Sequence, residues 1–132
     1  MKVKCICEKS DKLERRHYAV GYTKRSRLAL EKEQIYHVCG ISLWKGLLSY
    51  LILDDDELPV WYPTELFSVI DSSIPSTWCF AEFSNFPSYD LEAIWGYLEL
   101  TNSGEHYDEL AVHDLAAIDL FIKRKSEMYG ES

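Results

Sequence analysis

The pattern of apolar and polar residues divides the chain into a region of short strands followed by a helical region. Short apolar runs separated by turn-forming residues predict strands at 34–40, 47–53, 59–62, 66–70 and 77–83. The alternating segment 3–7 and the segment 17–22 predict two more strands, with a loop at 24–27. Short strands at this spacing indicate a small antiparallel SH3-like β-barrel, or a curled sheet, over about residues 1–85.

Near the C-terminus the apolar period changes from that of strands to that of a helix. The pattern predicts one long amphipathic helix over about 103–128, capped by Asn102 or Ser103, and its apolar positions are Tyr107, Leu110, Ala111, Leu115, Ile118, Phe121 and Ile122. The segment 88–100 fits a strand or a helix equally well. The predicted fold class is therefore α+β, with a long C-terminal amphipathic helix.

Composition bounds the organisation of the chain. With 132 residues, 47% hydrophobic content and no Pro/Gly/Ser-rich linker, we expect a single domain, 1–132, with one core. The sequence has neither a signal-peptide pattern nor an apolar run long enough to cross a bilayer. Four cysteines (Cys5, Cys7, Cys39 and Cys79) in a chain of this size are typical of reduced, mostly buried thiols. We therefore expect a soluble, cytoplasmic protein.

Charge is distributed very unevenly along the sequence. Residues 1–45 contain 11 Lys/Arg against 5 acids, whereas residues 46–122 contain 15 acids and no Lys or Arg. Because surface charges of both signs usually intersperse, this stretch of 77 residues predicts a negative field. Two interpretations stay open: N-terminal cations fold back over the acids, or the acids form a face that attracts a basic partner.

Reactive residues do not form a recognisable catalytic or metal-binding motif. The cysteines lack the Cys-x-x-Cys spacing of zinc sites. His106 and His113 share a predicted helix face with Asp114, which leaves an acid–base or metal site there as an alternative, and the glycines do not form a phosphate-binding loop. We expect no catalytic residue, no metal and no cofactor. The basic residues Arg15, Arg16 and 24–27 suit nucleic acid, but a pI near 4.9 opposes it.

Several segments resemble small bacterial immunity proteins that are encoded beside polymorphic or contact-dependent growth-inhibition toxins. The resemblance covers roughly residues 30–110 and rests on Ile-Tyr-His-Val at 35–38, Tyr-Leu-Ile-Leu-Asp at 50–54, Pro-Val-Trp-Tyr-Pro at 59–63, Leu-Phe-Ser-Val-Ile-Asp at 66–71, Pro75 and Trp78. It implies a bacterial, cytosolic protein that binds and blocks a toxin domain, often a nuclease with a basic active site. It implies no catalytic residues.

The charge pattern and the resemblance lead to one functional hypothesis. We expect an acidic surface that occludes the active site of a cognate toxin, because opposite charges accelerate association and tryptophan and tyrosine anchor basic side chains. The predicted contact residues are Asp54, Asp55, Asp56, Glu57, Trp61, Tyr62, Asp108 and Glu109. The alternatives are an SH3-like adaptor for proteins or peptides, and a small enzyme that uses His106 and His113.

Overall fold

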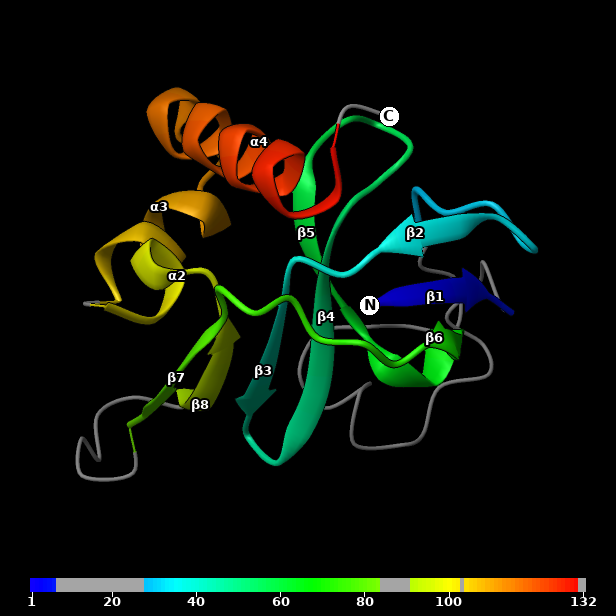
Figure 1. The fold of residues 1–132 in the computed structure, drawn as a ribbon, viewed down its shortest axis with the longest axis horizontal. Coiled ribbons are helices and arrows are strands. Elements are labelled where there is room, and N and C mark those ends of the chain that lie inside the picture. The colour runs from blue at the N-terminus through cyan, green and yellow to red at the C-terminus, as the bar shows by residue number, and fades with distance from the viewer. Residues whose placement is uncertain (7–27, 84–90, 103, 131–132) are drawn as a thin grey trace.

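The computed structural model describes residues 1–6, 28–83, 91–102 and 104–130 (Figure 1). The elements follow in the order β1 (Lys2–Cys5), β2 (Ile35–His37), β3 (Gly40–Trp44), β4 (Leu47–Leu53), β5 (Pro59–Pro63), the 3-10 helix η2 (Thr64–Leu66), β6 (Phe67–Asp71), β7 (Cys79–Glu82), β8 (Leu91–Gly96), α2 (Leu98–Asn102), α3 (Glu105–Ala111) and α4 (Leu115–Tyr129).

The strands form two antiparallel sheets. One has three strands in the order β2-β1-β6, and the other has five in the order β5-β4-β3-β8-β7. The predicted α+β class is confirmed. The described strands do not close into a barrel, because β6 pairs with β1 instead of continuing the sheet from β5, and β8 inserts between β3 and β7.

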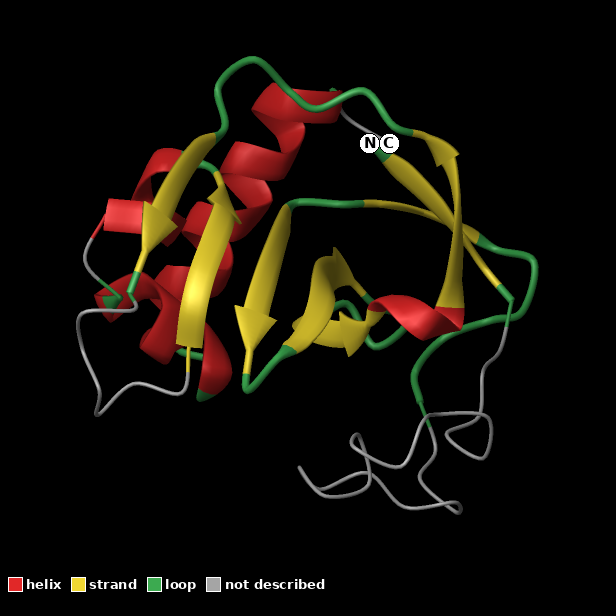
Figure 2. Cartoon of the chain, turned by 90° about the horizontal axis from the view of Figure 1, so that it is seen from below, coloured by secondary structure: helices red, strands yellow, loops and turns green. Residues whose placement is uncertain are grey.

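One face of the five-stranded sheet is covered only in part. A row of side chains crosses it from β5 to β7, formed by Tyr62, Tyr50, Ile41, Trp95 and Phe80. Tyr50 and Tyr62 are buried with Val3 and Phe67 of the three-stranded sheet, whereas Phe80 at the far end is 55% exposed. Figure 2 shows the helices and the three-stranded sheet toward opposite sides of the molecule.

The opposite face of the five-stranded sheet packs against α2, α3 and α4, which we call the helical layer. Leu51 and Ile94 of the sheet are buried with Leu100, Leu110 and Phe121 of the helices. Two glycines that pair across β3 and β8 allow this approach, because a Cβ at either Gly40 or Gly96 would lie 2.6 Å from Cδ2 of Leu100. The glycines therefore bring α2, which carries Glu99, directly against the sheet.

The predicted single helix over 103–128 is wrong in its continuity. α3 ends at Ala111, His113 adopts a positive φ of 54°, and Asp114 begins α4 by accepting a hydrogen bond from the backbone N–H of Ala117 at 3.1 Å. The break changes the phase of α4 relative to α3. As a result Phe121 is fully buried, while Leu115 is 79% exposed.

Most predicted strands in the described part of the chain are present. β4 has the predicted bounds, and β1, β5, β6 and β7 differ from the prediction by one or two residues at their ends. The run 34–40 instead divides between β2 and β3, and β3 was not predicted. The ambiguous segment 88–100 contains both a strand and a helix, β8 and α2. The predicted strand 17–22 and loop 24–27 lie outside the described residues.

The C-terminal end of α4 packs beside the N-terminus. The Met1 amino group donates a hydrogen bond to the Tyr129 hydroxyl at 3.2 Å, and that hydroxyl donates to the carbonyl oxygen of Val38. The His37 ring stacks on the Tyr129 ring with 4.3 Å between centroids. In the part of the chain that the structure describes, no helix has both the length and the apolar character needed to span a membrane.

Candidate functional site

The β4–β5 connection contains four consecutive acids, 54–57, which we call the acidic turn. Asp54 is only 6% exposed, and its Oδ1 accepts hydrogen bonds from the backbone N–H groups of Asp56 at 3.0 Å and Leu58 at 3.1 Å. Its Oδ2 accepts a 2.8 Å bond from the Tyr62 hydroxyl. Asp54 therefore holds the turn together from inside.

Burial corrects the predicted contact surface at two positions. Asp54 and Tyr62 were expected to touch a partner, but Tyr62 is 5% exposed and belongs to the core beneath the three-stranded sheet. A group that is bonded inside the core is not available to another protein unless the hairpin opens. Asp54 and Tyr62 thus form an internal pair.

The other acids of the turn lie at the surface. Asp55 is exposed, yet its Oδ1 accepts a 2.8 Å hydrogen bond from the Tyr36 hydroxyl on β2. Asp56 and Glu57 are also exposed, and Glu57 has a positive φ of 61°. Among the four acids, Asp56 and Glu57 keep carboxylates directed outward that could meet a partner.

Trp61 links the sheet to the helical layer. Its ring lies 5.7 Å from the ring of Tyr107 on α3, measured between centroids. Trp61 is half-buried, and its Nε1 is the buried side-chain polar atom without a hydrogen-bond partner in the described structure. The acidic turn directly precedes β5, the strand of Trp61, whereas Asp108 and Glu109 lie on α3. The predicted acids therefore form two groups, with Trp61 between them.

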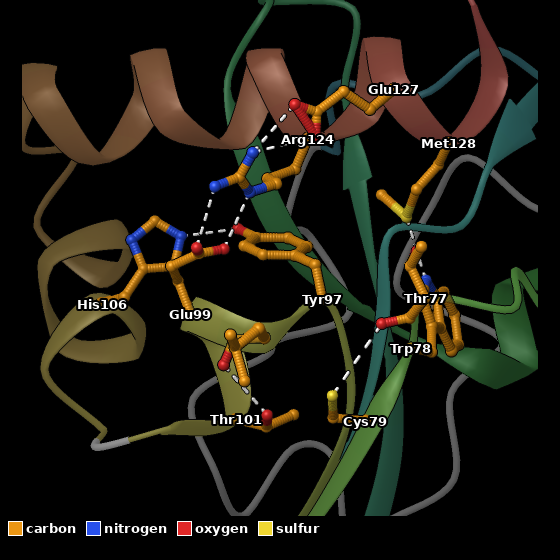
Figure 3. A network of polar contacts seen from close by, with 11 residues as sticks. Thr77, Trp78, Cys79, Tyr97, Glu99, Thr101, His106, Arg124, Glu127 and Met128 are labelled. Carbon is orange, nitrogen blue, oxygen red and sulfur yellow. Dashed lines mark hydrogen bonds and ion pairs between the residues drawn. The ribbon is translucent and has the colours of Figure 1, made fainter.

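Arg124 of α4 fixes the helical layer (Figure 3). Its Nε and one terminal nitrogen donate to the two carboxylate oxygens of Glu99 on α2, at 2.8 and 2.9 Å, and the other terminal nitrogen donates to Glu127. This bidentate arrangement is the strong geometry for an arginine–carboxylate pair. It lowers the pKa of Glu99 to about 2. Glu99 therefore carries its charge at any physiological pH.

A second polar pair lies beside this clamp. The Tyr97 hydroxyl and Nε2 of His106 are 2.6 Å apart, and both side chains are buried (Figure 3). Desolvation lowers the pKa of His106, although the nearby Glu99 carboxylate opposes that shift. Burial raises the pKa of Tyr97 far above its usual range. At neutral pH both groups are therefore uncharged. Their hydrogen bond joins α3 to the end of β8.

His106 also lines a shallow pocket between the three helices. The pocket has a volume of about 240 Å³ and is lined by Glu99, Asn102, Glu105, His106, Glu109 and Leu120. Desolvation and the neighbouring carboxylates of Asp114 and Glu105 raise the pKa of Glu109. Like charges thus crowd this part of the helical layer. Electrostatically, the pocket favours a cationic group over an anionic one.

The reactive residues that the sequence singled out are spread through the structure. Cys5 and Cys39 are buried in different core clusters, Cys79 is exposed, and Cys7 lies outside the described residues. His113 is exposed in the α3–α4 connection, so it does not join His106. Within the described ranges, no three His, Cys, Asp or Glu side chains are grouped so that they could hold a metal ion.

Asp108 and Glu109 stay predicted contact residues, in surroundings that the sequence did not indicate. Asp108 is exposed and Glu109 half-buried on α3, in the position expected for surface acids. The clamp between Glu99 and Arg124 joins residues 25 apart on different helices, and no local spacing signals it. The Tyr97–His106 pair also could not be predicted, because Tyr97 lies at the transition from β8 to α2 that the sequence pattern left open. Comparison with protein-family models, with curated proteins and with solved structures gave no match for this chain.

Proposed function

We propose that this protein is a cytoplasmic binding protein, without an enzymatic activity of its own, that neutralises a cognate bacterial toxin by covering a basic active site. One observation carries the proposal: residues 98–122, which build most of the helical layer, contain six acids and no lysine or arginine. The last turns of α4 carry three cations, Lys123, Arg124 and Lys125, and Arg124 is engaged by Glu99 and Glu127. The layer is thus left with excess negative charge.

The arrangement of the acids supports binding over a purely structural role. The bidentate clamp and the Tyr97–His106 pair hold the helices rigidly, so Asp108 and Glu109 are presented without a large entropic cost on association. An active site that binds nucleic acid is basic, and an acidic surface can occupy it. Steering between opposite charges also speeds the encounter, as rapid capture of a toxin requires.

The proposed contact surface is centred on Asp108 and Glu109, with Trp61, Asp56 and Glu57 toward the acidic turn. Asp55 contributes charge while its carboxylate stays bonded to Tyr36. The same charge argues against nucleic acid as the partner, because the layer would repel phosphates. The resemblance to immunity proteins agrees with this proposal, and it needs no metal or cofactor.

A second candidate is an SH3-like adaptor that binds an extended peptide. It is favoured by the open end of the five-stranded sheet, where Phe80 on the edge strand β7 lies 5.1 Å from Trp95 between ring centroids. An extended peptide can add to a strand edge of this kind while its side chains contact neighbouring aromatics. The two candidates use different faces, so they can be separated by mutation.

The direct test is to co-express the chain with the protein encoded by its neighbouring gene, which the proposal expects to be the toxin. Size exclusion and calorimetry at about 50 and 300 mM salt should give a tight complex whose affinity falls with salt. Glu109→Lys should weaken the complex, whereas Phe80→Ser, the matched change on the sheet edge, should leave it intact. A missing complex, or one sensitive only to Phe80→Ser, would move the assignment to the adaptor.

A further inference from the structure

α4 carries apolar residues on two sides. The inner side, which includes Ala117 and Phe121, is buried at 3% and 0% exposure. The other side has Leu115, Ile118 and Ile122, which we call the outer stripe; Leu115 is 79% and Ile122 46% exposed. Spacings of three and four residues place these three side chains on one helix face. A surface helix normally has one apolar stripe, so the second one requires its own explanation.

Another exposed apolar residue precedes α4. Val112, in the connection that precedes the helix, is 77% exposed. Single exposed apolar residues are common on protein surfaces, whereas a row of them along a helix is typical of an interface. Charge defines what could cover this row: Asp119 lies within it, four residues after Leu115, and Asp108 is exposed on α3. The N-terminal half of the stripe thus has an acidic border at Asp119, while Lys123 follows Ile122 at its other end.

We infer that the outer stripe binds an amphipathic helix of a protein partner, whose apolar side chains are bordered by lysine or arginine. This inference rests on the proposed function, because it identifies the part of the basic toxin that the helical layer would hold. Helix faces of this kind pack side by side through residues at three- and four-residue spacing. Apolar burial would supply affinity, and the acidic border would select a basic helix.

Charge argues against a second copy of this chain as the occupant. Two antiparallel copies of α4 that matched Leu115 with Ile122 would bring their Asp119 carboxylates together near the symmetry axis. Like charges in such a position destabilise an interface. The formal net charge of -8 opposes self-association as well. The stripe therefore suits a partner of opposite charge.

The test uses a labelled, end-capped 14-residue Leu/Lys peptide with helical spacing and a Leu/Glu peptide of the same pattern. Fluorescence anisotropy should detect binding of the Leu/Lys peptide only. The double variant Leu115→Ser/Ile122→Ser should raise its Kd by about tenfold or more, and Asp119→Lys by about fivefold. The matched control Leu48→Ser/Ile74→Ser, at positions 45% and 57% exposed on β4 and in the β6–β7 connection, should change Kd by no more than about twofold.

Three results would overturn the inference: no binding of the Leu/Lys peptide, equal binding by the double variant, or equal binding of the Leu/Glu peptide. A wild-type dimer in sedimentation that the double variant abolishes would also overturn it, because a second copy would then cover the stripe. The same variants in the toxin complex separate the two proposals. If the toxin binds wild type and double variant equally, only the role of the outer stripe is rejected. If the Leu/Lys peptide binds and the toxin does not, the proposed toxin-neutralising function is rejected.

Discussion

The acidic turn and the helical layer are both rich in carboxylates, but they use them differently. In the turn, Asp54 accepts hydrogen bonds from backbone N–H groups and from Tyr62 of its own sheet, and Asp55 accepts one from Tyr36 of the three-stranded sheet. In the helical layer one acid, Glu99, is clamped by Arg124, while Asp108 and Asp119 are exposed. The density of acids along a sequence therefore does not by itself measure the charge available to a partner.

The largest expected effect concerns the inner acid of the turn. Asp54→Ala removes the acceptor of two backbone N–H groups and leaves the buried Tyr62 hydroxyl without its partner, so we expect the free energy of unfolding to fall by about 3 kcal/mol. Asp56→Ala, at an exposed neighbour, should change it by no more than about 0.5 kcal/mol. Urea unfolding curves give both values. Equal midpoints for the two variants would mean that Asp54 is not structural.

The Glu99–Arg124 clamp of the helical layer should contribute less to the free energy of unfolding than the hydrogen bonds of Asp54 in the turn. Its side chains are 26% and 31% exposed, and solvent screens the pair, so we expect Arg124→Gln to lower the free energy of unfolding at pH 7 by less than Asp54→Ala does. The pKa of Glu99 is about 2 in the folded protein and near 4.5 ordinarily. The clamp therefore stabilises the fold fully above pH 4.5, and this contribution is lost as the pH falls toward 2.

Urea unfolding of Arg124→Gln and wild type at pH 7, 4 and 2.5 measures this dependence. The difference between them should shrink at the lowest pH. Glu127→Gln provides the matched control, because Glu127 is 52% exposed and makes only the outer contact with Arg124. A difference that is constant from pH 7 to 2.5 would show that Arg124 acts through packing and not through Glu99.

The smallest expected effect belongs to His106. Its folded-state pKa is lowered by desolvation, so the unfolded chain takes up a proton first as the pH falls below 6.5. The His106 contribution to stability should therefore decline as the pH falls below 6.5. His106→Gln should remove this part of the slope. The same slope in wild type and His106→Gln would contradict the assignment.

The sequence predicted the strands well where alternation and turn residues coincide. β4 and the acidic turn were found because an apolar run ends at consecutive acids at hairpin spacing. Pairing could not be predicted, since β6 joins β1 across more than 60 residues and β8 inserts between β3 and β7. Such non-local pairings leave little trace in a local pattern, which is why a barrel was expected.

In the helical region the apolar spacing correctly indicated helix, but it assigned some residues to the wrong side of that helix. Leu110, Leu115 and Phe121 were assigned to one apolar side of one helix, but the break at His113 changes the phase. Leu110 and Phe121 are buried, while Leu115 points outward. The one local signal for this break is Asp114, which can cap a helix as well as lie within one. The sequence therefore indicated the acids of the candidate surface, but it did not indicate the exposed apolar stripe on α4.

The central claim is that the helical layer contributes more than the acidic turn to the capture of the basic partner. Association kinetics with the toxin at about 50 mM salt test it most directly, in wild type, Asp108→Lys/Glu109→Lys and the matched Asp56→Lys/Glu57→Lys. The account predicts an association rate at least about tenfold slower for the layer variant and no more than about threefold slower for the turn variant. Equal rates, or a larger loss for the turn variant, would contradict it.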